Sequence, residues 1–413
     1  MDNKKLYKHV VNDNYNDKGK FIKEKRKELN LSQKELADAI GLPKYGDRTI
    51  RRWEQGETSP TKLELASLIT FFEELNQKPF INNDNARYTM IDLFSGIGGT
   101  RLGFHLTNKV QTVFSSEIDK FSNKTYFANF GEIPHGDITE INENEVPDHD
   151  ILVAGFPCQA FSQAGKKKGF EDTRGTLFFD IARIIKAKRP KVFLLENVKN
   201  LRTHDKKRTF STIKETLKEL DYEVRDVLYK ARDFGVPQNR ERIYIIGFDK
   251  KTIDVNIITK FRLPTPMNKE TCVGDILEDN VDEKYTISDR LWEGHKRRKE
   301  MHKSKGNGFG YSIFNEKSPY TNTISARYYK DGSEILIEQK GKNPRKITPR
   351  EAARLQGFPE EFIIPVSDTQ AYKQFGNSVC VPVIYSIAKE MLKVLDLQYN
   401  ENLNAKKEYL LEK

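Results

Sequence analysis

The chain has 413 residues, enough for more than one ordinary domain, and 31% of them are charged, with 70 Lys and Arg against 60 Asp and Glu. The resulting formal net charge of +10 is compatible with a polyanionic partner but does not establish one. Three widely separated cysteines argue against a disulfide framework or a CxxC metal site, and the chain shows no signal peptide and no run of about 18 apolar residues, so we expect a cytoplasmic protein without a membrane span.

Residues 1–80 are charged and carry apolar side chains at helical spacing. Ser32 followed by Glu35 predicts a capping box that opens a helix, which should end at Gly41. A second helix is expected from about Arg48 until a glycine at position 56. Two short helices joined by a turn predict a helix-turn-helix.

The sequence of this predicted motif, LSQKELADAIG at 31–41 with WEQGE at 53–57, resembles the DNA-binding domains of Cro/repressor-type regulators. The resemblance implies that the helix carrying Arg48, Arg51 and Arg52 enters the major groove of DNA. The alternative is a helical docking module whose basic side chains are simply solvated.

After a polar linker at 76–87, apolar strands alternate with helical stretches, which predicts an α/β domain with a mainly parallel sheet covered on both faces. The expected strands are 90–94, 110–115, 151–155, 192–196 and 243–248, and the expected helices between them include 178–188 and 210–220.

The alternation stops at about residue 249, and residues 249–345 read as a smaller second lobe with a basic run at 295–299 and short strands at 321–326 and 335–339. Residues 346–395 return to helical periodicity and should fold back onto the first lobe. The expected domains are therefore 1–80, 88–248, 249–345 and 346–395.

Polar or Gly-rich segments follow three successive strands of the predicted sheet. The turn at 92–99 contains several glycines, which permit close backbone approach to a ligand, and Glu117 stands where an acid commonly binds ribose hydroxyls. Asp137 follows the third segment and can accept a hydrogen bond from an adenine amino group. Together these positions indicate a cofactor that contains a nucleoside.

A cysteine, a glutamate and a pair of arginines come at the ends of other strands. Pro157 precedes Cys158 directly after a buried strand, so the thiol should lie at the ligand-binding edge of the sheet. Glu196 ends an apolar run, where desolvation requires a partner or a function. Arg240 and Arg242 precede the next strand and can pair with a carboxylate or a phosphate.

In this order and spacing the segments GFPCQAFS, ENV, QNRERIY and QFGNSV resemble the DNA (cytosine-5)-methyltransferase family over roughly residues 88–393. The resemblance is strongest to bacterial enzymes that methylate within CCGG. It implies a Rossmann-like S-adenosylmethionine-dependent methyltransferase domain with a target-recognition lobe, and it requires no metal.

The resemblance also assigns roles to individual residues. Cys158 would be the nucleophile, Glu196 would hold the cytosine edge, Arg240 would orient Glu196 and the base, and Arg242 would support the site. Ile118 stands where family members often carry an aromatic side chain that stacks on adenine. The residues expected to bind S-adenosylmethionine are Phe94, Gly96, Gly98, Glu117, Ile118, Asp137, Ile138, Pro157 and Asn377.

The base must leave the DNA helix to reach such a pocket. The Gly- and Lys-rich segment 162–175 is a candidate loop that closes over double-stranded DNA, with Ser162, Lys166 and Lys167 as contacts. In the second lobe, Thr323 matches a family position that helps to hold the flipped nucleotide, and Arg327 is a candidate groove or backbone contact.

These expectations describe a monomeric enzyme that protects host DNA against a cognate restriction endonuclease, with an N-terminal domain that can regulate its own operon. Two alternatives remain open from the sequence. One is a tRNA cytosine-5 methyltransferase of similar architecture, and the other is a non-catalytic repressor whose large domain senses the cofactor.

Overall fold

The computed structural model describes residues 15–28, 31–43, 45–76, 78–157, 177–267, 269–308 and 310–411. Four predicted site residues, Cys158, Ser162, Lys166 and Lys167, lie outside the described residues. The chain divides into two compact units, Met1–Ile81 with Phe127–Glu132, and Asn82–Tyr126 with Ile133–Lys413. Within the described residues, no helix is both long and apolar enough to cross a membrane.

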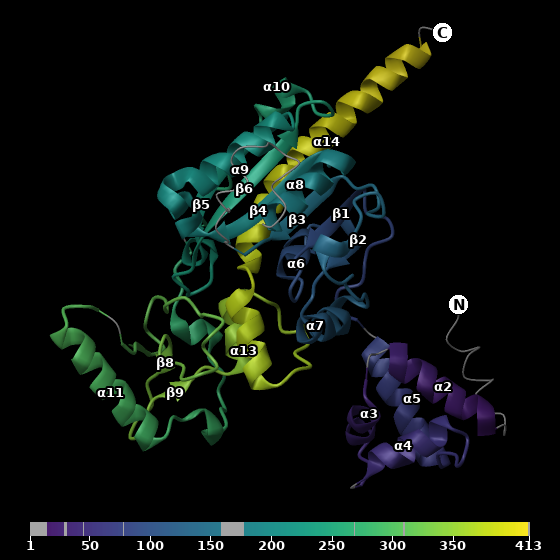
Figure 1. The fold of residues 1–413 in the computed structure, drawn as a ribbon, viewed down its shortest axis with the longest axis vertical. Helices are drawn as coiled ribbons and strands as arrows, with labels where there is room; N and C mark the ends of the chain where they lie inside the picture. Colours follow the sequence, from purple (N-terminus) through teal and green to yellow (C-terminus); the bar gives the residue numbers. More distant parts are fainter. Residues whose placement is uncertain are drawn as a thin grey trace. The chain divides into compact units, whose positions relative to one another are not determined.

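The N-terminal unit is a small bundle of helices, drawn in purple and blue in Figure 1. Its core is formed by apolar side chains from all four helices, including Ile22, Leu36, Ile50, Trp53 and Leu68. Gly41 and Gly56 adopt φ +73°, a left-handed conformation that suits glycine, and so end α3 and α4 as predicted. The helices are α2 (Tyr15–Glu28), α3 (Gln33–Ala39), α4 (Gly46–Glu54) and α5 (Lys62–Asn76).

Buried polar contacts hold α2, α3 and α4 together. Glu54 accepts hydrogen bonds from Nη2 of Arg26 at 3.0 Å and from Nε2 of Gln33 at 2.8 Å. The Glu54 side chain is only 4% exposed, so these contacts compensate a carboxylate that would otherwise be costly to bury.

The larger unit is built on a six-stranded sheet of order β2-β1-β3-β4-β6-β5 (Figure 1). Pairing is parallel from β2 to β4, while β6 runs antiparallel to both β4 and β5. The α/β fold is thus confirmed, but β5 was not among the expected strands. It pairs only with β6 and contains several charged residues, so its sequence lacks the apolar run of a buried strand. The strands are β1 (Tyr88–Leu93), β2 (Val110–Ser116), β3 (Ile151–Gly155), β4 (Val192–Val198), β5 (Tyr222–Lys230) and β6 (Glu241–Asp249).

Helices cover both faces of this sheet, and alternate strand residues point to opposite faces. Met90 and Val153 belong to a core cluster shared with α14, whereas Ile91 and Leu152 belong to one shared with α8 and α9. The helices of this half are α6 (Gly99–His105), α7 (Lys120–Phe130), α8 (Leu177–Lys188), α9 (Arg208–Glu219), α10 (Val255–Ile258) and α14 (Val381–Leu411).

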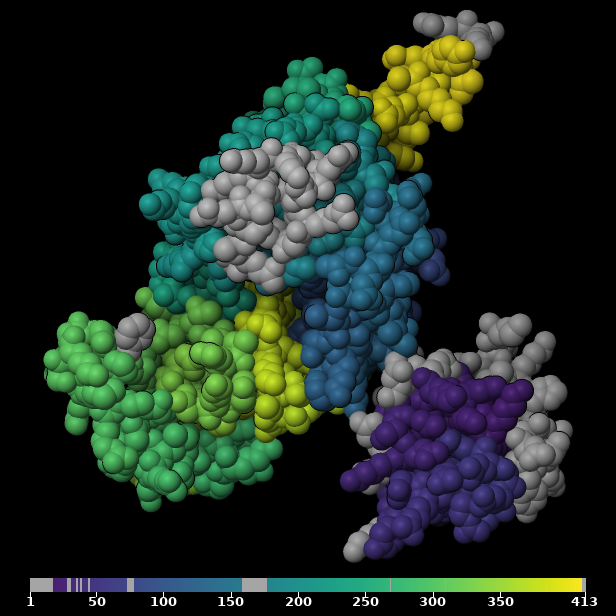
Figure 2. Space-filling view, in the orientation of Figure 1, coloured from purple at the N-terminus to yellow at the C-terminus, as the bar shows by residue number. Residues whose placement is uncertain are grey.

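The chain beyond α10 forms the smaller lobe predicted for target recognition, drawn in green in Figures 1 and 2. This lobe starts later than the expected residue 249, because Ile257, Ile258 and Phe261 pack in the core cluster shared with α14. The predicted strand at 321–326 is wrong, because only Thr321 forms an isolated bridge, to Gln238, and the rest is irregular. In place of the predicted strand at 335–339, the structure has the shorter strand β8, whose bounds follow. The lobe contains the helix α11 (Asp289–Ser304). It also contains a separate three-stranded sheet of β7 (Ile313–Phe314), β8 (Leu336–Ile337) and β9 (Arg345–Lys346).

Two helices, α12 (Pro349–Leu355) and α13 (Asp368–Asn377), return the chain from the lobe to the sheet. In Figure 2 this yellow segment lies at the surface between the blue and green parts of the larger unit. Short 3-10 helices complete the fold at η1 (Ile138–Glu140), η4 (Lys199–Arg202), η5 (His204–Lys207), η6 (Ala231–Phe234), η7 (Val273–Ile276) and η8 (Glu283–Tyr285).

Candidate active site

A pocket of about 650 Å³ opens where the parallel strands end. Its walls come from the turns after β1, β2, β3 and β4, from the start of β6 and from α13, as expected for an open α/β sheet. Gly98 is absent from the described lining and instead forms the left-handed N-cap of α6. The predicted residues that do line it are Phe94, Gly96, Glu117, Ile118, Asp137, Ile138, Pro157, Glu196, Arg240, Arg242 and Asn377.

The turn after β1 is tied directly to Glu117. One carboxylate oxygen of Glu117 accepts a hydrogen bond from the backbone N–H of Gly96 at 2.9 Å, and the other accepts from the N–H of Asp119 at 2.8 Å. Phe94 and Gly96 both have positive φ, so the turn adopts a backbone that is costly for Phe94. These contacts fix the Glu117 carboxylate before any ligand arrives and leave acceptor capacity for two hydroxyl groups.

Asp137, the third acid, does not follow a strand as expected, because only His135 forms an isolated bridge, to Ser116, before it. Oδ1 of Asp137 accepts hydrogen bonds from the N–H and the hydroxyl of Thr139, at 2.9 and 2.8 Å, and so caps η1. Ile138 beside it is buried, whereas Ile118 is 71% exposed. An exposed aliphatic side chain at the pocket rim can cover one face of a flat ring with less area than an aromatic one.

Glu196 at the end of β4 faces Arg242 at the start of β6. The Nε of Arg242 lies 3.2 Å from Oε1 of Glu196, and the two side chains are 17% and 12% exposed. Burial raises the pKa of Glu196, while Arg242 and Arg240 act in the opposite direction. Oε1 itself is closed off from solvent, and its contact with Arg242 is an ion pair without hydrogen-bond geometry.

Arg240 is almost completely buried and its hydrogen bonds go to the end of α13. Nη1 donates to the carbonyl of Gly376 at 3.2 Å, and Nη2 donates to the carbonyl of Ser378. Burial lowers the pKa of Arg240 to about 10, with Arg242 acting in the same direction. The direct ion pair to Glu196 therefore comes from Arg242, and contact between Arg240 and a base stays a prediction.

Pro157, the last described residue before Cys158, lines the pocket beside Glu196. The side-chain amide of Asn197 donates to the carbonyl of Phe156 at 2.8 Å and is 2% exposed. This bond fastens the chain entering Cys158 to the strand end that carries Glu196. The sequence analysis did not assign a role to Asn197, although it belongs to the ENV motif.

Two further buried polar side chains at this edge were not predicted. Oε1 of Gln374 accepts a hydrogen bond from the hydroxyl of Thr125 at 3.0 Å, and its Nε2, in the pocket wall, has no described partner. Asp92, at 1% exposed, leaves Oδ2 without a described partner, and burial raises its pKa to about 8. Unpaired buried donors and acceptors beside a pocket are the signal for ligand-facing or strained residues.

Among the described residues, the predicted nucleic-acid contacts are not part of the pocket lining. The Thr323 hydroxyl donates to the carbonyl of Asn239 at 2.7 Å, and Arg327 is exposed. In the N-terminal unit, Arg48, Arg51 and Arg52 are all exposed on α4. Arg48 lies over the ring of Tyr45, and Arg52 is 3.4 Å from a carboxylate oxygen of Glu57. Over the described part of the chain, no His, Cys, Asp and Glu cluster could hold a metal ion.

The sheet, the pocket at its carboxyl edge and the separate lobe define a methyltransferase of the C-5 cytosine-specific DNA methylase family, whose model matches residues 88–393. The chain belongs to that family and is a DNA cytosine-5 methyltransferase. A helix-turn-helix model also matches residues 22–74, which identifies the N-terminal unit as a helix-turn-helix domain.

Individual relatives place the chain among type II methyltransferases. It is 71% identical to type II methyltransferase M1.ScrFI of Lactococcus lactis subsp. cremoris, over 91% of this chain and 95% of that protein. It is 68% identical to type II methyltransferase M.SsoII of Shigella sonnei, over 91% and 98%. The solved structure of the Entamoeba histolytica methyltransferase EhMeth shares the fold, with a TM-score of 0.60 and 22% identity over 76% of this chain and 99% of that one.

Proposed function

We propose that this enzyme transfers the methyl group of S-adenosylmethionine to C5 of a cytosine flipped out of double-stranded DNA, through a covalent bond between Cys158 and C6. The observation that carries the proposal is the largely buried ion pair of Glu196 with Arg242, whose two side chains line the same pocket as Pro157. A carboxyl group at this place can bind the edge of a base presented to the thiol that follows Pro157.

The pocket residues fit the cofactor as well as the base. Glu117 is held in place to accept the ribose hydroxyls, Asp137 can accept the adenine amino group, and the backbone of Gly96 permits close approach. S-adenosylmethionine supplies an electrophilic methyl group when it is bound. We assign its remaining polar groups to Asn377 at the end of α13, which lines the pocket.

The reaction needs these residues because C5 of cytosine is a weak nucleophile. Attack of the Cys158 thiolate on C6 breaks the conjugation of the ring and makes C5 enamine-like. Negative charge then develops toward N3, where a protonated Glu196 can donate a hydrogen bond, and its raised pKa favours that protonated form. After methylation a base removes the C5 proton, and the C6–sulfur bond breaks to release the thiolate and restore the ring.

We further propose that the enzyme modifies CCGG and thereby protects DNA from a cognate restriction endonuclease in the bacterial cytoplasm, acting as a monomer. The type II names of the relatives support the restriction-modification context. The exposed arginines of α4 support a second role, in which the N-terminal domain binds the promoter of its own operon.

The test is base-resolution cytosine methylation of DNA from a methylation-free host that expresses this chain or its Cys158→Ala variant. We expect one methylated motif with the parent chain and none with the variant, which should still bind DNA. Full methylation by the variant would show that Cys158 is not the nucleophile. Methylation of a motif other than CCGG would show that the proposed recognition sequence is wrong. No methylation by soluble parent protein would favour a tRNA substrate, to be assayed next, or the regulatory alternative.

A further inference from the structure

We propose that Gln238 is a positioning residue that couples the recognition lobe to Arg240 and Arg242. When the lobe binds its target DNA sequence, this coupling orients the two arginines in the pocket. The inference rests on the proposed function. Gln238 precedes Arg240 by two residues, is 0% exposed and is not part of the pocket wall. It therefore acts through other residues and does not itself contact a base or cofactor.

The Gln238 side chain bonds to two segments far away in the sequence. Its Oε1 accepts a hydrogen bond from the backbone N–H of Ile324 at 3.1 Å. Its Nε2 donates to the carbonyl of Leu355 at 2.8 Å and to Oε1 of Gln356 at 3.2 Å. One buried amide thus joins the segment that leads into β6, the irregular segment of the lobe and the end of α12.

Backbone and hydroxyl contacts reinforce the first of these connections. Thr321 donates its N–H to the carbonyl of Pro237 at 2.8 Å and accepts from the N–H of Asn239 at 2.9 Å. The hydroxyl of Thr323 donates to the carbonyl of Asn239 at 2.7 Å. Residues 237–239 and 321–324 therefore form one continuous contact, and the side chain of Gln238 lies at its centre.

The second connection leads to the partners of Arg240. Gln356 donates its Nε2 to the carbonyl of Phe375 at 2.6 Å, and Arg240 donates to the next carbonyls along the chain, those of Gly376 and Ser378. A shift of α12 is thus transmitted through Gln356 to the groups that fix the Arg240 guanidinium. Arg242, two residues further on, pairs with Glu196.

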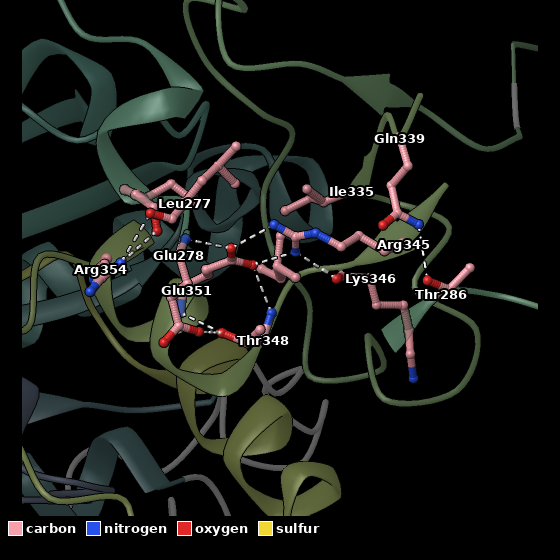
Figure 3. A network of polar contacts seen from close by, with 12 residues as sticks. Leu277, Glu278, Thr286, Ile335, Gln339, Arg345, Lys346, Thr348, Glu351 and Arg354 are labelled. Atoms are coloured by element: carbon pink, nitrogen blue, oxygen red, sulfur yellow. Dashed lines mark hydrogen bonds and ion pairs between the residues drawn. The ribbon is translucent and has the colours of Figure 1, made fainter. Parts of the chain in front are cut away.

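The other end of α12 is fastened to the lobe by the network in Figure 3. Arg345 of β9 forms two hydrogen bonds of 2.7 Å with the carboxylate of Glu351, which is 0% exposed. The same carboxylate accepts from the N–H groups of Thr348 at 2.8 Å and Glu278 at 2.9 Å. A fully compensated buried ion pair resists separation, so α12 moves with the lobe.

The lobe is therefore connected to the arginines of the pocket by two routes. Gln238 is part of the first, the contact of 237–239 with 321–324, and it donates to the end of α12 in the second. Removing its hydrogen bonds should leave the cofactor side of the pocket intact, because Glu117 and Asp137 have no bond to it. The same loss of hydrogen bonds should leave Arg240 and Arg242 less well oriented when DNA is bound. The expected deficit is in base extrusion and in kcat, with little change in cofactor affinity.

The experiment compares Gln238→Met with the parent enzyme, since Met has a similar length and cannot replace the amide bonds. A DNA duplex carries the mapped target motif with 2-aminopurine beside the target cytosine, and its fluorescence at saturating enzyme reports base extrusion. We expect kcat to fall about tenfold, the size expected for the loss of buried hydrogen bonds, with a matching loss of fluorescence. Binding of S-adenosylhomocysteine should change less than about twofold.

The matched control is Gln339→Met. Gln339 donates Nε2 to the hydroxyl of Thr286 at 3.0 Å and to the carbonyl of Asn343 at 2.7 Å, entirely within the lobe (Figure 3). This variant should retain the parent kcat and fluorescence. Equal loss in both variants, or a lower melting temperature of Gln238→Met with unchanged kcat and fluorescence, would show that Gln238 only stabilises the fold and would overturn the coupling.

If Gln238→Met does not fold, Gln356→Met tests the second connection, because it removes the bonds of that amide to Gln238 and to the carbonyl of Phe375. It should lower fluorescence at saturating DNA and leave the binding of S-adenosylhomocysteine unchanged. Normal fluorescence with Gln356→Met would count against the coupling. An inactive parent enzyme would contradict the proposed function instead, so the two failures are distinguishable.

Discussion

At the scale of single residues, Glu196 combines burial with an incomplete set of partners. Its pKa is raised because the carboxylate is removed from water, and Arg242 at 3.2 Å compensates only part of that cost. An ordinary structural ion pair would satisfy both oxygens. A carboxyl group poised between its two protonation states is suited to stabilise charge that develops on a bound base.

Replacing Glu196 with Gln should lower kcat by about a hundredfold or more, because the amide keeps the shape but cannot supply the acidic proton. Binding of S-adenosylhomocysteine should be unchanged. Glu241→Gln is the matched control, since Glu241 begins β6, the strand that pairs with the Glu196 strand β4, and its carboxylate lies 3.1 Å from Nζ of Lys199. Steady-state methylation at saturating DNA measures the effect, and equal activity of the two variants would exclude a chemical role for Glu196.

Asp92 leads to a prediction about stability and pH. Its pKa is raised by burial to about 8 in the folded protein, against about 3.9 when the chain is unfolded. Between these values the folded state binds more protons, so the free energy of unfolding should fall as pH rises from about 4 to about 8. Asp92→Asn should remove this part of the slope, and urea unfolding at several pH values measures it. An unchanged slope would place the Asp92 pKa near its ordinary value.

At the scale of elements, α4 has one buried and one exposed face. Ile50 and Trp53 pack in the core of the N-terminal unit, while Arg48, Arg51 and Arg52 face solvent. Because Glu54 is fixed by Arg26 and Gln33, the helix presents these arginines in a defined direction. Such a surface suits insertion into a groove of DNA.

The double substitution Arg51→Ala and Arg52→Ala should weaken binding to the promoter of the operon. It should also make the slope of the logarithm of the binding constant against the logarithm of salt concentration shallower, by the amount that corresponds to about two phosphate contacts. Methylation should be unaffected. The control is Lys406→Ala with Lys407→Ala, two exposed cations of α14. Titration of a labelled promoter duplex at several salt concentrations gives the answer, and parent-like affinity in the double variant would argue against autoregulation.

At the scale of the whole molecule, the chain contains two units with separate cores. The pocket lies entirely in the larger unit, and the exposed arginines of α4 lie in the smaller one. DNA methylation and the proposed promoter binding should therefore be separable by changes in the smaller unit that leave the pocket intact.

A chain that begins at Asn82 should still methylate the same motif and should lose promoter binding. Because Phe127–Glu132 groups with the N-terminal unit, this shortened chain should also unfold at a lower temperature. Methylation sequencing and thermal unfolding of the two chains test both statements. A shortened chain that folds but methylates nothing would show that the N-terminal unit takes part in catalysis.

The sequence by itself determined the class of fold and the helix-turn-helix, and most of the described residues that it predicted for the cofactor and the base line one pocket. These features depend on local patterns: apolar runs that end in polar residues, glycines at turns and helical spacing. The parallel strands appeared within a few residues of their observed bounds because a buried strand must be apolar throughout. The edge strand β5 was missed because its one-sided pairing permits charged residues.

Only the tertiary structure decided which groups meet. It paired Glu196 with Arg242 and directed Arg240 to the end of α13, although only one residue separates the two arginines in the same motif. It also gave Gln238 its partners in the lobe and in α12, more than 80 residues away. Contacts of this kind depend on how distant segments pack, and no local pattern of spacing or composition encodes them.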